Sequence, residues 1–293
     1  MADAPDTPAP DSPAPESGEH APDSAELRPA AEAAGMDLGT RVASYDERDA
    51  MLYALAVGAT AADLDLVFER RLRVLPTLGV ALGLWASDEL RERGFFSAAN
   101  ALHAGQRLEV REPLPPAGQL ELQGRVGAVW DKGKAALFEV EVACEQFSAV
   151  YSIFAPGRGG WGGERGPSAR RDPDEAPTRR ARARTSPEQA VLYRLTGDRH
   201  LIHVDPEAAR AAGLPRPILH GLCTLGFAVR ELAGLLRAHP ADLRSLETRF
   251  AAPVLPGDRL EVGAWEPGAD GAAPFAVESA GEKVLTGGLV RFA

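Results

Sequence analysis

Apolar and polar positions alternate over long stretches in the middle of the chain. The triplets LEL (120–122) and VEV (140–142) place apolar side chains on one face only, which is typical of antiparallel strands with one solvated face. The run DKGK (131–134) predicts a hairpin turn. The alternation predicts strands over residues 107–115, 119–133 and 134–156.

Helical spacing of apolar positions precedes these strands. Residues 44–59 predict a helix in which Ser44 is the N-cap and Glu47, three positions later, completes a capping box. The pattern predicts a strand over 66–76, ending at a proline, and an apolar helix with a polar far end over 77–94.

The second half of the chain repeats the first about 140 positions later. Residues 50–55 (AMLYAL) align with 190–195 (AVLYRL), and 113–116 (PLPP) aligns with 253–256 (PVLP). A helix that begins near Gly221 is apolar nearly all round, so we expect it to be buried. Each half predicts a helix held by a strongly bent antiparallel sheet, which is an α+β fold.

Two stretches interrupt this repeat. Residues 1–24 are rich in Pro, Ala, Asp and Ser without apolar periodicity, so we predict a disordered tail. Residues 157–186 are rich in Gly, Pro and Arg and predict a solvated connector; their GGWGG run lacks the lysine and following apolar helix of a phosphate loop. We expect one half of the repeat over 25–156 and the other over 187–293.

Charge and cysteine content narrow the class of protein. The net charge is −10, which argues against nucleic acid as a partner, because phosphate binding needs a basic face. No run approaches the roughly 20 apolar residues of a membrane span, and because the first residues lack a basic region followed by an apolar one, we expect no secretory signal. Cys144 and Cys223 lie in apolar contexts and predict reduced thiols. We therefore predict a soluble, cytoplasmic protein that does not bind membranes.

The densest chemistry lies in residues 190–238, which hold Asp198 and three of the six histidines: His200, His203 and His220. Asp198 and His203 can converge on one pocket if the segment between them turns, and such a pair can take and return a proton. As alternatives, Asp198 could be only a turn residue, His203 only a buried histidine, and His220 either a support for the helix entry or part of a pocket lining.

Only the second half carries this chemistry. At the repeat offset, Asp198 corresponds to Gly58 and His203 to Asp63. Asp205 before Pro206 is most simply a helix N-cap with proline at the first helical position.

Metal and nucleophile chemistry are both disfavoured. His200 and His203 with Asp198 have ligand types that suit zinc, but a cysteine cluster and the His-Glu-x-x-His pattern are missing. No Ser or Cys sits in a nucleophile elbow, and Cys223 inside an apolar helix should be inert. We expect no metal and no cofactor.

The segment YRLTGDRHLIHVDP (193–206), followed by PILHGL (217–222), resembles the hydratase 2 motif of the MaoC-like (R)-specific enoyl-CoA hydratases. In the first half, YALAVG (53–58) and DKG (131–133) are similar to the hydratase region of the peroxisomal multifunctional enzyme type 2. The resemblance covers roughly residues 40–293. It implies a double hot-dog fold, a homodimer, and reversible hydration of trans-2-enoyl-CoA to (3R)-3-hydroxyacyl-CoA without metal or organic cofactor.

The resemblance also implies residue roles. The half over 187–293 would be catalytic and the half over 25–156 non-catalytic and acyl-binding. Asp198 and His203 would be the catalytic pair, and the backbone of Gly221 would face the thioester oxygen. This chain has His200-Leu201 where family members have Asn-Pro, and His200 could supply a hydrogen bond from the same place. The positions expected to contact the acyl-CoA are His103, Lys132, Arg199, His200 and Phe250.

Three other functions remain open at this point. The same fold could serve a thioesterase or a dehydratase acting on a carrier-bound acyl chain. A non-catalytic acyl-thioester binder is the alternative from another class, although the intact Asp198 and His203 pair counts against it.

Overall fold

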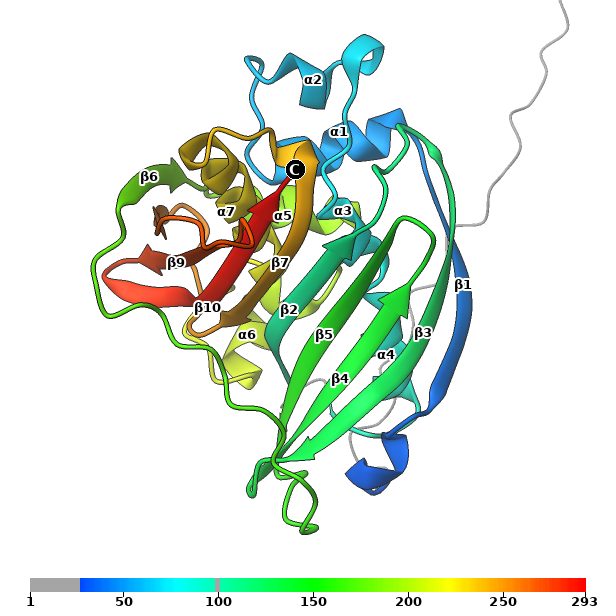
Figure 1. Cartoon of the computed structure of the whole chain (residues 1–293). Helices are drawn as coiled ribbons and strands as arrows, with labels where there is room; N and C mark the ends of the chain where they lie inside the picture. The colour runs from blue at the N-terminus through cyan, green and yellow to red at the C-terminus, as the bar shows by residue number, and fades with distance from the viewer. Residues whose placement is uncertain (1–26, 98–100) are drawn as a thin grey trace, which may run out of the picture.

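A computed structural model describes residues 27–97 and 101–293; the tail predicted over residues 1–24 lies outside this part. Ten strands form one continuous antiparallel sheet in the order β1-β3-β4-β5-β2-β7-β10-β9-β8-β6, with the helices behind it (Figure 1). The strands are β1 (Asp37–Tyr45), β2 (Leu102–Val110), β3 (Gly118–Asp131), β4 (Ala135–Ala143), β5 (Phe147–Pro156), β6 (Arg179–Arg184), β7 (Leu243–Phe250), β8 (Arg259–Ala264), β9 (Ala273–Ser279) and β10 (Glu282–Phe292).

The strand order reads as two similar halves that meet at β2 and β7. Each half has five strands, and antiparallel pairing of β2 with β7 joins them edge to edge. Arg107 pairs with Glu247, its own counterpart 140 positions later, so the pseudo-twofold axis of the repeat passes between these two residues. The double hot-dog fold is confirmed, with the two predicted sheets fused into one.

Helices α1, α3, α4 and α7 pack against the sheet. In the second half α7 (Gly221–Leu235) is unbroken and contributes ten buried residues. In the first half the predicted helix over 77–94 is divided at Gly83, where a Cβ atom would lie 2.5 Å from the hydroxyl of Tyr151. The α-helices are α1 (Glu47–Ala56), α2 (Leu64–Val67), α3 (Leu78–Leu82), α4 (Trp85–Glu92), α5 (Gln189–Tyr193), α6 (Pro206–Ala211) and α7 (Gly221–Leu235).

Two local predictions in the first half are wrong. Ser44 belongs to β1, where it pairs with Gln119, so the N-cap of α1 is Asp46, which forms a reciprocal capping box with Asp49. Residues 66–76 form the end of α2 and a 3-10 turn at Glu69–Arg71 instead of a strand. The edge of the sheet beside β3 is occupied by β1, so residues 66–76 do not pair there. The apolar pattern did not predict strand β1.

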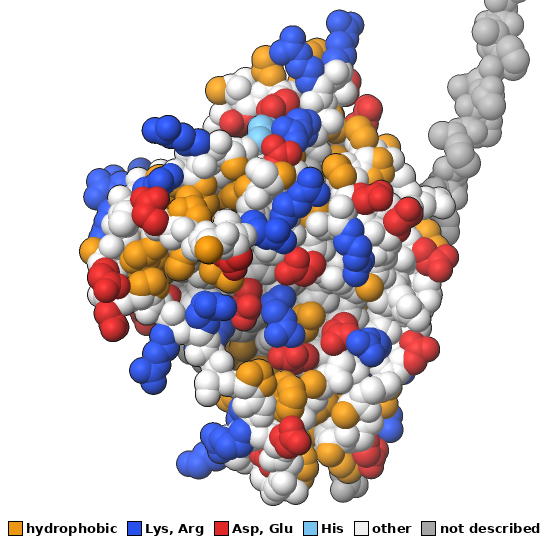
Figure 2. All heavy atoms as spheres, viewed as in Figure 1, with side chains coloured by type: hydrophobic (Ala, Val, Ile, Leu, Met, Phe, Trp, Pro, Cys, Tyr) orange, Lys and Arg blue, Asp and Glu red, His pale blue; other side chains and the backbone are white. Residues whose placement is uncertain are grey.

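The outer face of the sheet carries both signs of charge. Basic and acidic side chains are interspersed over the face seen in Figure 2, and cross-strand ion pairs such as Arg107–Glu139 and Arg125–Glu141 lie on these strands. This face therefore lacks the continuous basic surface that nucleic acid requires. Within the described ranges, none of the helices has the length and apolar character that a membrane crossing requires.

The segment expected to be a solvated connector is mostly exposed, and it is also held to the rest of the protein at several points. Residues 179–184 form β6, which pairs with β8. The carboxylate of Asp131, which is 4% exposed, accepts N–H bonds from Gly160 (2.9 Å) and Gly162 (2.8 Å), and also from Gly163 and Gly133. The predicted β3–β4 turn is confirmed, and its aspartate fastens the glycine-rich loop to it.

Replacing Asp131 by Ala should release this loop. The hydrogen bond from Gly160, assisted by those from Gly133, Gly162 and Gly163, lowers the pKa of the Asp131 carboxyl. A lowered folded pKa means that the carboxylate stabilises the fold above its unfolded pKa of about 3.9, and that this stabilisation is lost as the pH falls toward the folded pKa. We expect faster amide exchange over residues 157–166 at pH 7, measured by mass spectrometry. Asp270→Ala removes a turn acceptor elsewhere and should leave amide exchange over residues 157–166 unchanged. If these amides were equally protected in both variants, Asp131 would not anchor the loop.

Candidate active site

The loop between α5 and α6 brings Asp198 and His203 together. Gly197 adopts φ +130°, a conformation that side chains disfavour, and Oδ1 of Asp198 then accepts the N–H of His200 at 3.1 Å. A 3-10 turn follows at Leu201–His203. One side-chain atom each from Asp198, His203 and His220 lies within 4.8 Å of the others, so the turn expected between the acid and the base is present.

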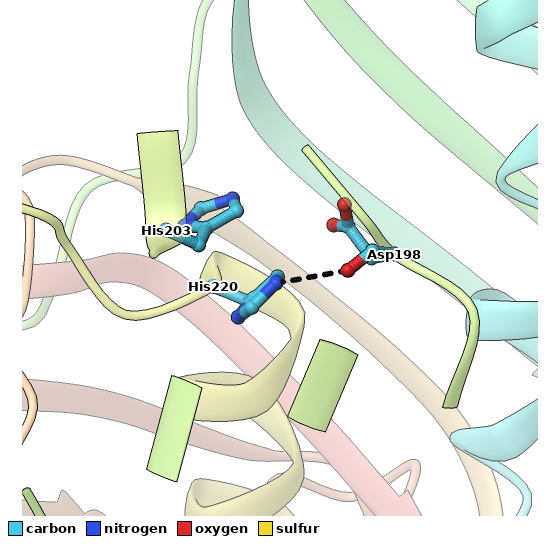
Figure 3. A group of neighbouring side chains, drawn as sticks. All are labelled: Asp198, His203 and His220. Carbon is cyan, nitrogen blue, oxygen red and sulfur yellow. Dashed lines mark hydrogen bonds between the residues drawn. The ribbon is translucent and has the colours of Figure 1, made fainter. Parts of the chain in front are cut away.

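His203 is held as a neutral base. Its Nδ1 lies 2.9 Å from the carbonyl oxygen of Ile218; because a carbonyl only accepts, Nδ1 carries the proton and Nε2 is free to accept one. Burial lowers the pKa of His203, and the charge of Asp198 partly offsets this effect. The free side of the ring and the carboxylate of Asp198 face the same space (Figure 3).

His220 packs directly beneath this pair. Its ring is stacked on His203 with centroids 3.7 Å apart and 25° between the planes, and its Nε2 lies 3.2 Å from the backbone oxygen of Asp198. The three side chains have metal-ligating types, but stacked imidazoles direct their lone pairs along nearly parallel planes. Lone pairs in that arrangement do not converge on one ion as tetrahedral zinc requires, so the geometry favours proton chemistry.

Three further predicted residues meet beside the pair. Gly221 is the first residue of α7, where helix N–H groups lack intrahelical acceptors and carry positive partial charge. A Cβ atom there would lie 3.0 Å from the ring of Phe250, whose centroid is 4.8 Å from that of His103. Burial lowers the pKa of His103 to about 4, so this ring is neutral. His103 comes from the first half and the other two from the second.

The remaining predicted contacts are more peripheral. Lys132 lies at the β3–β4 turn, at the sheet end where β2 begins and β7 ends, and its Nζ donates to the carbonyl oxygen of Arg165. Arg199 is exposed. His200 is also exposed, and its Nδ1 accepts the N–H of Ile202 at 3.3 Å, which caps the turn that ends at His203.

The equivalent loop of the first half has a packing role. Asp63, the counterpart of His203, accepts from Thr60 and forms an ion pair of 3.0 Å with Arg230 of α7. Gly58, the counterpart of Asp198, has φ +88°, and a Cβ there would lie 2.3 Å from the ring of Phe227. The loop of the first half therefore lacks the Asp and His of the second-half loop and instead supports α7.

Other sequence expectations can be placed as well. Asp205 is the N-cap of α6 with Pro206 at the first position, as predicted. Both cysteines are free. The carbonyl of Ile218 and the contact of His220 with Asp198 were not predicted, because nothing in the sequence indicates which backbone carbonyl a histidine ring reaches.

Comparison with known proteins identifies the relatives of this chain. A family model described as MaoC like domain matches residues 168–285, and one described as MFE-2 hydratase 2 N-terminal domain matches residues 43–154. The chain is 37% identical over 242 residues to the enoyl-CoA hydratase ChsH3 of Mycobacterium tuberculosis, covering 77% of this chain and 85% of that protein. It is 38% identical over 256 residues to the 3-hydroxyacyl-thioester dehydratase Y of the same organism, covering 81% and 87%. A crystal structure of a MaoC-like dehydratase from Phytophthora capsici superposes with a TM-score of 0.81 at 28% identity, covering 91% of this chain and 98% of that one.

The ionisation of His203 can be tested by following its imidazole through a pH titration by NMR. We expect a pKa below the ordinary value of about 6.5, and a further decrease in Asp198→Asn, because the carboxylate charge raises it. With a lowered folded pKa the unfolded chain binds this proton first, so His203 reduces the free energy of unfolding only as the pH falls below about 6.5. An unchanged or raised pKa in Asp198→Asn would mean that the two side chains do not interact.

Proposed function

Because the chain belongs to the MaoC-like hydratase 2 family, we propose that it catalyses the reversible hydration of trans-2-enoyl-CoA to (3R)-3-hydroxyacyl-CoA. The observation that carries this proposal is the shared space between the carboxylate of Asp198 and the unprotonated side of His203, beside the N-terminus of α7. An acid, a base and a donor for developing negative charge are the groups that this reaction needs.

In the proposed mechanism Asp198 and His203 act together on one water molecule. The pair removes a proton from the water as its oxygen forms a bond to Cβ of the enoyl thioester. The electrons of the double bond move toward the thioester oxygen. They return when the pair delivers a proton to Cα, which completes the addition and restores both side chains. Dehydration is the same sequence in reverse.

The backbone N–H of Gly221 is the proposed donor to the thioester oxygen. The positive end of α7 favours negative charge there, and a Cβ atom at this position would lie 3.0 Å from the ring of Phe250, so a side chain would require that ring to shift. A donor of this kind is typically worth about 3 kcal/mol of activation free energy.

The substrate contacts follow the resemblance. His103 and Phe250 would line the acyl side, where their rings touch, while Lys132, Arg199 and His200 would contact the acyl-CoA nearer the surface. A homodimer and a cytoplasmic location remain predictions of the same kind. A carrier-bound acyl thioester is the second candidate substrate, since one relative is named for a 3-hydroxyacyl thioester and not for CoA.

The proposed activity is tested by the loss of enoyl-thioester absorbance with crotonyl-CoA and with a C10 enoyl-CoA. We expect wild type to form the (3R) alcohol, and Asp198→Asn and His203→Ala each to lower kcat by about 10²- to 10⁴-fold, the usual contribution of general acid–base groups. Asp205→Asn is the matched control, because Asp205 caps α6 in the next turn of the same segment and should change kcat less than about threefold.

The products separate the alternatives. Release of free thiol would indicate a thioesterase. Turnover of an enoyl carrier protein but of neither CoA ester would indicate a carrier-bound substrate, and ligand binding with no turnover of any of them would indicate a binding protein.

His200 stands where family members have Asn, and the effect of this difference is tested by comparing His200→Asn with His200→Ala. An asparagine oxygen can accept the N–H of Ile202 as Nδ1 does now, so we expect kcat/KM to stay within about threefold of wild type. Alanine removes the cap, at a cost of about 1 kcal/mol, or about fivefold in rate. Equal effects of both substitutions on hydration kinetics would show that the cap does not position His203.

A further inference from the structure

We propose that His220 is a positioning residue that holds Asp198 and His203 in register, an inference that rests on the proposed function. Its imidazole reaches both members of the pair (Figure 3). The ring stacks on His203 at 3.7 Å between centroids, and Nε2 lies 3.2 Å from the backbone oxygen of Asp198. One rigid ring therefore contacts the base and the loop that carries the acid.

The ring of His220 serves this loop and not the helix that it precedes. His220 is the N-cap of α7, a position where a side chain usually accepts an N–H of the first turn. Its side chain makes no such bond to the helix. Because the partner at Asp198 is a carbonyl, Nε2 must be the donor, so the proton of His220 is committed to the loop.

The support behind His220 is rigid. The side chain is 1% exposed, the ring of Tyr193 lies 4.8 Å from it, and its backbone oxygen accepts the N–H of Thr224 within α7. Two residues earlier, Ile218 bonds the same loop twice: its oxygen accepts from His203, and its N–H donates to the oxygen of Ile202 at 3.3 Å. Residues 218–220 thus form three hydrogen bonds with the loop.

His220 is suited to hold the pair without exchanging protons with it. Burial, reinforced by the neighbouring His203, lowers the pKa of His220 to about 3. The ring therefore stays neutral while His203 titrates, and two stacked charged imidazoles are avoided. Its Nδ1 is buried without a hydrogen-bond partner, and because the pKa is so low this nitrogen does not compete for the proton of the reacting water.

Two substitutions separate the contacts of His220. Phenylalanine keeps a ring against His203 but has no N–H for Asp198, whereas glutamine keeps an N–H donor at similar reach and loses the ring. We expect His220→Phe to lower kcat for crotonyl-CoA by about 10- to 100-fold with KM changed less than about threefold, since a misplacement of about 1 Å has such an effect. His220→Gln should recover part of this loss and remain about 3- to 10-fold below wild type.

A double variant tests whether His220 acts through the pair. Asp198→Asn already removes the acid–base pair whose geometry His220 would hold. In that background we therefore expect His220→Phe to lower kcat by less than about threefold. His239→Phe is the matched control. Like His220, His239 is the N-cap of a helical segment, here a short 3-10 turn, but it is absent from the Asp198 cluster. The kcat of this variant should stay within about twofold of wild type.

The outcomes distinguish this inference from the function on which it rests. If wild type is active and the kcat of His220→Phe is within twofold of it, the inference alone is overturned. The same follows if His220→Phe lowers kcat equally in the wild-type and Asp198→Asn backgrounds. An inactive wild type overturns the proposed function itself and this inference with it. Should His220→Phe fail to fold, as judged by circular dichroism, a loss below twofold in His220→Gln would overturn the positioning role.

Discussion

The antiparallel pairing of β2 with β7 is the constraint on which the rest of the molecule depends. It fuses two five-stranded halves into one sheet and places the beginning of β2 beside the end of β7. His103 and Phe250 meet at that place, and Phe250 in turn packs against Gly221 at the N-terminus of α7. A site assembled across this junction exists only while the two halves remain paired.

The repeat places the first half in direct contact with the helix that begins at the candidate site. The loop around Gly58 and Asp63 packs on α7 through Phe227 and Arg230, and the oxygen of Ala56 accepts from Gln189 and from the thiol of Cys223. Because α7 begins at the candidate site, contacts from the first half help to place its axis and its first N–H groups. The candidate site therefore depends on both halves of the chain.

The sequence predicted what depends on periodicity and on local turns. The alternation over β3 to β5, the turn at residues 131–134, the 140-residue repeat and the N-cap at Asp205 are all confirmed. Prediction from the sequence failed where long-range strand pairing overrides the local pattern. Ser44 lies in β1, and strand β6 lies within an Arg-rich segment. The roles assigned to Asp198 and His203 stay predictions, although the expected proximity is present. The stacking of His220 on His203 joins residues from two segments, and no local pattern encodes such a contact.

The electrostatics of the site fit the circulation of one proton. His203 and His220 are buried and His103 is partly buried, and removal from water lowers the pKa of each. Near this cluster Asp198 supplies a negative charge that raises all three pKa values in part. A buried site with one carboxylate stabilises one added positive charge far better than two. Because Nδ1 of His203 and Nε2 of His220 both donate to carbonyl oxygens, the nitrogens left to accept a proton on these two stacked rings are Nε2 of His203 and Nδ1 of His220. Burial and the neighbouring His203 lower the pKa of His220 to about 3, so the transferred proton is held on Nε2 of His203. The hydrogen bonds that orient the rings, together with the low pKa of His220, therefore determine the route of the proton.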